Sequence, residues 1–265
     1  RFPLLSSVIM TVTPAVAAGV GEVIMCTPPR VHPDDVSESS KSGAGVPGKA
    51  FVGGKPYADE GVMAAAYICG VNHLYAVGGA QAIGAMAYGT ESIPKVDVIV
   101  GPGNKYVATA KKLVYGKVGI DMIAGPTEVM IIADDSANAE WVAADLLAQA
   151  EHDVVAQPIL VTTSTALAEK VSAEIENQLE TLTTKATARQ SIDNFGVIII
   201  ADSLEQAAEI ANKKAPEHLE LALEQGEERT KLESLVHNYG SLFIGHYAAE
   251  VYGDYAAGLN HTLPT

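Results

Sequence analysis

Short runs rich in valine and isoleucine alternate along the chain with longer segments of helical character. These runs do not alternate apolar with polar residues, which is typical of strands covered on both faces. Strands are predicted over 22–26, 74–77, 96–100, 129–133, 159–162, 197–201 and 241–244, and helices over 7–18, 59–69, 80–88, 104–114, 137–149, 166–182, 204–212 and 227–237. This order predicts an α/β fold of two Rossmann-like βαβ domains with mostly parallel sheets.

Two serines lie where helix N-caps are expected. Ser136 precedes the helix that carries Gln149, and Ser203 is followed by Gln206 at capping-box spacing. Within 166–182, apolar residues recur at every fourth position and predict a core-facing stripe rather than a cofactor groove.

Composition and charge exclude several classes of protein. A chain of 265 residues can bury one large core or two small ones. The net charge of −15 and the lack of a basic stripe argue against nucleic acid as a partner. No run approaches the roughly 20 apolar residues of a membrane helix. Cys26 and Cys69 are too few for a disulfide framework, so we expect buried thiols in a cytoplasmic protein.

The two ends of the chain lack the usual terminal features. The sequence begins at Arg1 without a starting Met or a signal-peptide pattern, and it stops at Thr265 without a charged tail. We therefore expect a piece of a longer protein. Residues 30–55 are rich in Ser, Gly, Pro and Asp, which predicts a mobile surface loop, either a tolerated insertion or a lid.

Gln149 and His152 lie three residues apart at the end of a predicted helix. This spacing places both side chains on one face, where an amide oxygen and an imidazole nitrogen could bind one cation. A solvated helix face is the alternative. Asp254 and His261 bracket a turn-forming segment and would complete a ligand set suited to zinc. For Asp254, a cap or turn role is the alternative.

The pair Glu217-His218 follows Pro216 directly and precedes an apolar run. A carboxylate beside an imidazole in a partly dry site can supply a base and a water activator near neutral pH. Histidines next to Glu at helix ends are common, so the pair indicates a catalytic site only in combination with the other clusters.

Two glycine clusters each follow a predicted strand and open a helix. They are Gly78-Gly79-Ala80-Gln81 and Gly101-Pro102-Gly103-Asn104, and we expect them at the same end of one sheet. Such positions bind nucleotide phosphates in α/β folds. Neither cluster is the G-x-G-x-x-G fingerprint, and a tight strand–helix turn is the alternative reading of each.

Taken together, six motifs in this order resemble the histidinol dehydrogenase family. They are GGAQAI from 78, GPGN from 101, IDMIAGPTE from 120, QAEH from 149, PEHL from 216 and GDY…NHTLPT from 253. The resemblance covers nearly the whole chain. It implies a zinc-containing homodimer that oxidises L-histidinol to L-histidine in two NAD-dependent steps, with an NAD-binding domain at 1–126 and an incomplete zinc- and substrate-binding domain at 127–265.

The resemblance also implies a role for each matched residue. Gln149, His152 and Asp254 correspond to zinc ligands that also contact substrate, and Glu217 and His218 to the catalytic acid–base pair. Further matches are Thr127, which stands where the family usually has Ser, His218 and His261 at the substrate, and Gln81 and Asn104 at NAD. An NAD-contacting Tyr would lie before Arg1. A fourth zinc ligand and a substrate-binding Glu would lie beyond Thr265, in a tail that reaches the partner subunit.

The mechanism that the resemblance implies is hydride transfer from an alcohol bound to zinc, with His218 removing the hydroxyl proton. Glu217 then activates a water molecule that attacks the aldehyde carbon, so that a second hydride can leave. One alternative is a family relative that oxidises another small polyol or hydroxy acid with NAD. Another is a binding or scaffolding protein that keeps the fold without the chemistry.

Overall fold

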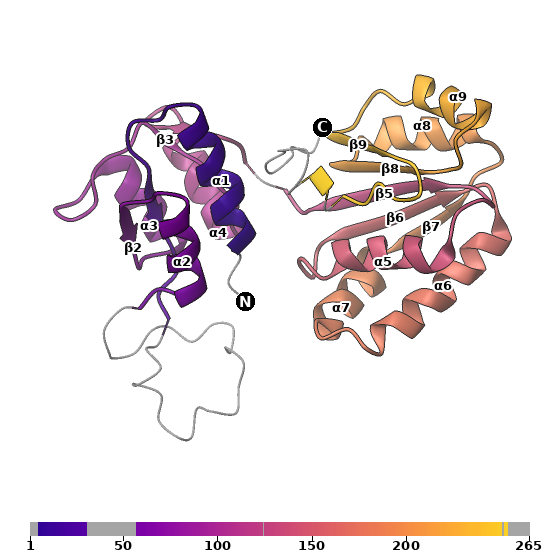
Figure 1. Cartoon of the computed structure of the whole chain (residues 1–265), viewed down its shortest axis with the longest axis horizontal. Coiled ribbons are helices and arrows are strands. Elements are labelled where there is room, and N and C mark those ends of the chain that lie inside the picture. Colours follow the sequence, from indigo (N-terminus) through magenta and orange to yellow (C-terminus); the bar gives the residue numbers. More distant parts are fainter. Residues whose placement is uncertain (1–4, 31–56, 124, 251, 254–265) are drawn as a thin grey trace. The chain divides into compact units, whose positions relative to one another are not determined.

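Residues 128–133 form the central strand of a five-stranded sheet with the order β7-β6-β5-β8-β9 (Figure 1). The computed structural model describes residues 5–30, 57–123, 125–250 and 252–253. Each neighbouring pair of strands in this sheet is parallel. The strands are β5 (Glu128–Ala133), β6 (Gln157–Thr162), β7 (Val197–Ile200), β8 (His218–Ala222) and β9 (Ser241–Ile244).

Helices cover both faces of this sheet (Figure 1). On one face lie α5 (Ala139–Ala150), α6 (Thr165–Leu179) and α7 (Lys185–Phe195), and on the other α8 (Leu204–Lys214) and α9 (Glu227–Leu235). Val129 and Ile131 pack with the first group, whereas Met130 and Ile132 pack with the second. Every residue of β5 is buried, which explains why its sequence lacks a polar alternation.

The chain divides into two compact units, Arg1–Ala124 and Gly125–Thr265. In the first unit, β1 (Ile24–Cys26) pairs with β2 (His73–Tyr75), and β3 (Val98–Ile99) pairs with β4 (Gly119–Ile120), both in parallel. The helices of this unit are α1 (Leu5–Ala17), α2 (Glu60–Ile68), α3 (Gly79–Tyr88) and α4 (Lys105–Val114). α1 packs on α2 and α3 packs on α4, each pair around its own apolar cluster.

The predicted α/β fold with mostly parallel sheets is confirmed, and several details differ. The strands β4 and β8 and the helix α7 were not predicted. β2 and β3 belong to separate two-stranded sheets, so the two glycine clusters do not follow strands of one sheet. The N-cap of α5 is Asn138, whose side chain accepts bonds from two first-turn amides, and not Ser136. Ser203 does cap α8 through the amide of Gln206.

Three other expectations meet the structure only in part. Across the described ranges, no helix is both long and apolar enough to cross a membrane. Cys26 and Cys69 are free thiols, but they are half-buried rather than fully buried, and burial raises the pKa of the Cys26 thiol. The polar segment 30–55 lies outside the described residues except for Arg30, whose backbone bridges to Tyr57.

A matched pair of isoleucine substitutions tests where the core of the second unit lies. Ile131 is fully buried and Ile200, on the edge strand, is 48% exposed. Ile131→Ala should lower the free energy of unfolding by about 2–5 kcal/mol, because it leaves a cavity. Ile200→Ala should cost about 1 kcal/mol or less. Urea unfolding followed by the fluorescence of Trp141, the single tryptophan, measures both; equal losses would contradict this core.

Candidate active site

The candidate site lies at the amino edge of the five-stranded sheet, where β5 and β8 begin. The parallel register pairs Val129 with His218. The residues just before each strand, Thr127 on one side and Glu217 on the other, therefore lie side by side. In this way two segments 90 residues apart come into hydrogen-bonding contact.

Thr127 is the centre of a short hydrogen-bond chain. Its hydroxyl donates to Oε2 of Glu217 at 2.9 Å and accepts from Nε2 of Gln149 at 2.7 Å. The backbone N–H of Glu128 donates to the same Glu217 oxygen at 3.2 Å. Glu217 is only 9% exposed, so its carboxylate is held by two donors in a largely dry place.

The His218 ring is oriented by the backbone of β5. Its Nδ1 lies 3.1 Å from the carbonyl oxygen of Glu128. A carbonyl oxygen only accepts, so Nδ1 carries the proton and the neutral ring has its lone pair on Nε2. Carboxylate oxygens of Glu250 and Glu217 lie 3.6 and 3.8 Å from Nδ1. This is the arrangement of a general base.

Gln149 and His152 both present unshared lone pairs of the kind that metal ions bind. Gln149 lies in the last turn of α5 and is 1% exposed; its amide nitrogen donates to Thr127, and its Oε1 is buried without a hydrogen-bond partner. His152 lies just beyond the helix. Its Nδ1 is 2.8 Å from the carbonyl oxygen of Ala148, which leaves Nε2 as the free acceptor. Both groups fit a zinc ligand set.

The other matched residues of this unit lie outside the described residues, namely Asp254 and His261. Within the part of the chain that the structure describes, no three His, Cys, Asp or Glu side chains are grouped to hold a metal. The described residues thus supply two candidate ligands, Gln149 and His152. The third, Asp254, stays a prediction.

A strained residue precedes the acid–base pair. Ala215 ends α8 with φ 50° and ψ 66°, the left-handed region that residues other than glycine avoid. Such strain is retained where the surrounding fold fixes the chain, often at functional sites. Here it turns the chain from α8 into β8 at Pro216. The last residue of the helix, Lys214, pairs with Glu128 at 2.6 Å and ties the same corner to β5.

The proposed cofactor residues, Gln81 and Asn104, belong to the first unit and are both exposed. Gln81 lies in the first turn of α3, whose N-cap, Gly78, makes no side-chain capping bond. A Cβ at Gly78 would lie 2.7 Å from Pro28, so only glycine fits there. Asn104 caps α4 by accepting from the amides of Tyr106 and Val107. The first-turn amides of α3 therefore have no side-chain cap, whereas two first-turn amides of α4 are hydrogen-bonded to Asn104.

A buried lysine that we did not single out from the sequence supports the second glycine cluster. Lys111 is 2% exposed, and its ammonium contacts the carboxylate of Asp121 and donates to the carbonyl of Gly101 at 3.0 Å. The other oxygen of Asp121 accepts from the Gly101 amide at 2.7 Å. In the sequence, Lys111 looks like an ordinary solvent-exposed lysine of the predicted helix, so nothing indicated that it would be buried. Lys111 and Asp121 together fix the loop that leads to Asn104.

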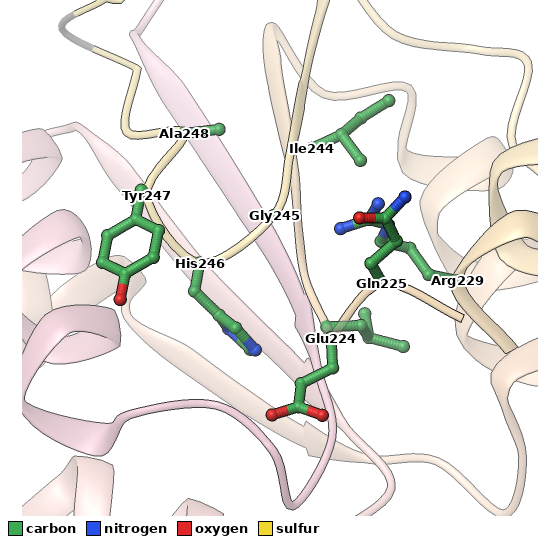
Figure 2. A pocket seen from close by; sticks show the side chains of 9 residues that line it. Glu224, Gln225, Arg229, Ile244, Gly245, His246, Tyr247 and Ala248 are labelled. Carbon is green, nitrogen blue, oxygen red and sulfur yellow. The ribbon is translucent and has the colours of Figure 1, made fainter.

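A surface cavity of ≈ 580 Å³ lies at the opposite, carboxyl edge of the sheet (Figure 2). It is lined by residues that follow β8 and β9, including Glu224, Arg229 and His246. Nε2 of His246 lies 3.5 Å from the hydroxyl of Ser136. The cavity contains none of the predicted site residues. The cluster around Thr127 and Glu217 at the amino edge is therefore the stronger candidate for the active site.

The fold is that of an α/β protein, this cluster is a candidate acid–base site, and comparison with known proteins shows the family. A family model described as histidinol dehydrogenase matches residues 1–265. The histidinol dehydrogenases of Streptococcus mutans and Bacillus cereus are 53% and 50% identical over 260 residues. A crystal structure of histidinol dehydrogenase from Elizabethkingia anophelis matches the whole chain with a TM-score of 0.85 at 40% identity. The chain belongs to the histidinol dehydrogenase family.

The match covers nearly all of this chain but only part of its relatives. The aligned region is 98% of this chain and 54% of the Streptococcus mutans and Bacillus cereus proteins. For the Elizabethkingia anophelis structure, it is 100% of this chain and 55% of that chain. The chain therefore spans about half the length of the relatives it matches.

Two substitutions of Thr127 test the hydrogen-bond chain. Thr127→Val keeps the shape but leaves the Gln149 amide nitrogen without its partner and removes one of the two donors to Glu217, which should cost about 1–3 kcal/mol in total. Thr127→Ser keeps the hydroxyl and should cost only about 0.8 kcal/mol for the lost methyl. Urea unfolding monitored at Trp141 compares them. If both variants lost the same stability, the hydroxyl would not be the centre of this cluster.

Proposed function

We propose that this chain carries the catalytic core of an enzyme that oxidises L-histidinol to L-histidine through the aldehyde, with zinc and NAD, in histidine biosynthesis. Membership of the histidinol dehydrogenase family supports the reaction class. The observation that carries the proposal is the pairing of Glu217, fixed by Thr127, with His218, whose Nδ1 is fixed by Glu128. A carboxylate and an imidazole with Nε2 free are the two proton acceptors that two successive oxidations need.

His218 is the base of the first step in this proposal. Its Nε2 takes the proton of the substrate hydroxyl, while Nδ1–H continues to donate to the Glu128 carbonyl. The ring then becomes positively charged beside the carboxylates of Glu217 and Glu250, which stabilise that charge.

Glu217 is the base of the second step. Its Oε2 accepts from both Thr127 and the Glu128 amide, so Oε1 is the oxygen available to take a proton from water. That water adds to the aldehyde carbon and sets up the second hydride transfer. Thr127 keeps the carboxylate oriented and, with His261, contacts substrate.

Gln149, His152 and Asp254 are the residues that would hold zinc. When bound, zinc would polarise the substrate hydroxyl, and two NAD molecules in succession would each accept one hydride. The buried and unpartnered Oε1 of Gln149 supports this assignment, because an acceptor without a donor is costly unless a cation occupies the place beside it. Gln81 and Asn104 would contact NAD from the first unit.

The proposal extends to assembly and location. The partner expected for this chain is a second copy of the full-length protein, whose tail would reach the active site of the first. We also propose that the enzyme works in the cytoplasm on a small-molecule substrate. The alternative is that this chain belongs to a relative that oxidises another small polyol or hydroxy acid. Such an enzyme would use the same two proton acceptors, Glu217 and His218.

The direct test is an assay of the full-length polypeptide that contains this chain, with histidinol, zinc and NAD. His218→Gln should lower the turnover number by about 10²–10⁴-fold, the usual contribution of a general base. His246→Gln, at the opposite edge of the same sheet, is the matched control and should leave turnover unchanged. Turnover of other small alcohols but not of histidinol would reject the proposed substrate, and an active His218→Gln enzyme would reject the proposed base.

A further inference from the structure

One residue at the start of β5, Glu128, is held through all three of its polar groups by a single short segment. Its backbone N–H donates to Oε2 of Glu217 at 3.2 Å, and its carbonyl oxygen lies 3.1 Å from Nδ1 of His218. Its side-chain carboxylate pairs with Nζ of Lys214 at 2.6 Å. The three partners thus lie within residues 214–218, which carry a lysine at one end and the proposed acid–base pair at the other.

The ion pair lies on the face of the sheet that α8 covers. Strand side chains alternate, so Glu128 points to the same face as Met130 and Ile132, which pack with residues of α8 and α9. Ala211, one turn before Lys214 on α8, is fully buried in that apolar cluster. The side chains of Glu128 and Lys214 are 11% and 27% exposed. Salt screens a pair in such a place only weakly, so each charge depends on the other.

The turn between Lys214 and the acid–base pair has a constrained backbone. Ala215 has a φ of 50°, in the left-handed region that residues with a side chain disfavour, so this turn must be held by its surroundings. After the turn, the backbone carbonyl of Glu217 accepts from the amide of Ser241 at 2.9 Å. This bond anchors the segment to β9, and the ion pair of Lys214 anchors it to β5 before the turn.

We propose that Lys214 is a positioning residue for both proposed proton acceptors, and that it acts through Glu128. Its ion pair fixes the side chain of the residue whose backbone N–H and C=O orient Glu217 and His218. Without the ammonium group, the Glu128 carboxylate would be buried without the cation that now pairs with it, so the start of β5 would shift to bring that charge to water. The roles of Glu217 and His218 rest on the proposed function, whereas the coupling between Lys214 and the Glu128 backbone does not.

Three variants isolate the contribution of the ammonium group. Lys214→Met keeps an unbranched side chain and removes the charge. Lys214→Arg supplies a different cation that can also bind a carboxylate, so it should restore most of what Lys214→Met loses. Lys213→Met is the matched control, because Lys213 is the preceding residue of the same helix and is exposed.

The first measurement is hydrogen exchange of backbone amides in the full-length polypeptide, and it needs no turnover. In Lys214→Met the Glu128 amide should exchange about 10-fold faster than in the natural protein, because its bond to Glu217 is no longer held in place. The amide of Ile131, in the centre of the same strand, should keep its rate. Lys213→Met should leave both rates unchanged.

Two results of this measurement would overturn the inference. An unchanged exchange rate of the Glu128 amide in Lys214→Met would show that the ion pair does not fix this backbone. Equal acceleration of the Glu128 and Ile131 amides would show that Lys214 only stabilises the unit as a whole.

The second measurement is the steady-state oxidation of histidinol by the full-length enzyme with zinc and NAD. Lys214→Met should lower the turnover number by about 10-fold and leave the Michaelis constant within about twofold, because a misplaced proton acceptor slows the chemical step rather than binding. Lys214→Arg should recover most of the turnover, and Lys213→Met should match the natural enzyme. A raised Michaelis constant with the natural turnover number would assign Lys214 to substrate binding and overturn its positioning role.

The inference and the proposed function can fail separately. Faster exchange at Glu128 in Lys214→Met, in a protein that does not oxidise histidinol, would reject the proposed function and support the coupling. Histidinol oxidation that is equally fast in the natural enzyme and in Lys214→Met would support the proposed function and overturn the positioning role of Lys214.

Discussion

The parallel pairing of β5 with β8 is the interaction on which the candidate site depends. It places Val129 opposite His218, and a slip of one residue would turn His218 and Glu220 toward the apolar layer under α8 and α9. The alternating burial of β5 against two helix layers fixes that register. The geometry of the candidate site is therefore a consequence of core packing.

The position of the cluster departs from the usual arrangement of α/β proteins, in which ligands bind beyond the carboxyl ends of the strands. Thr127, Glu217 and His218 all lie at the amino edge, where β5 and β8 begin. Strand starts offer a rigid backbone, and the Glu128 backbone uses both its N–H and its C=O to hold Glu217 and His218, the proposed catalytic groups. The site thus gains its preorganisation from the sheet itself, with one strained residue, Ala215, at the turn that leads into it.

The sequence predicted the fold class and most elements, because buried parallel strands leave long Val- and Ile-rich runs. It did not predict β8, where Pro216 precedes a strand interrupted by a buried acid, Glu220, so that the segment lacks a strand pattern. α7 was missed because its eleven residues carry little apolar stripe. The site residues could be named from their motifs, but the contact between Thr127 and Glu217 could not, since it arises from strand pairing across 90 residues.

Diffraction at the zinc absorption edge, from crystals of the full-length protein grown with zinc, tests the location of the active site most directly. The account predicts an anomalous peak at coordination distance, about 2.0–2.2 Å, from Oε1 of Gln149 and Nε2 of His152 at the amino edge. A peak beside His246 at the carboxyl edge, with none at Gln149, would contradict it.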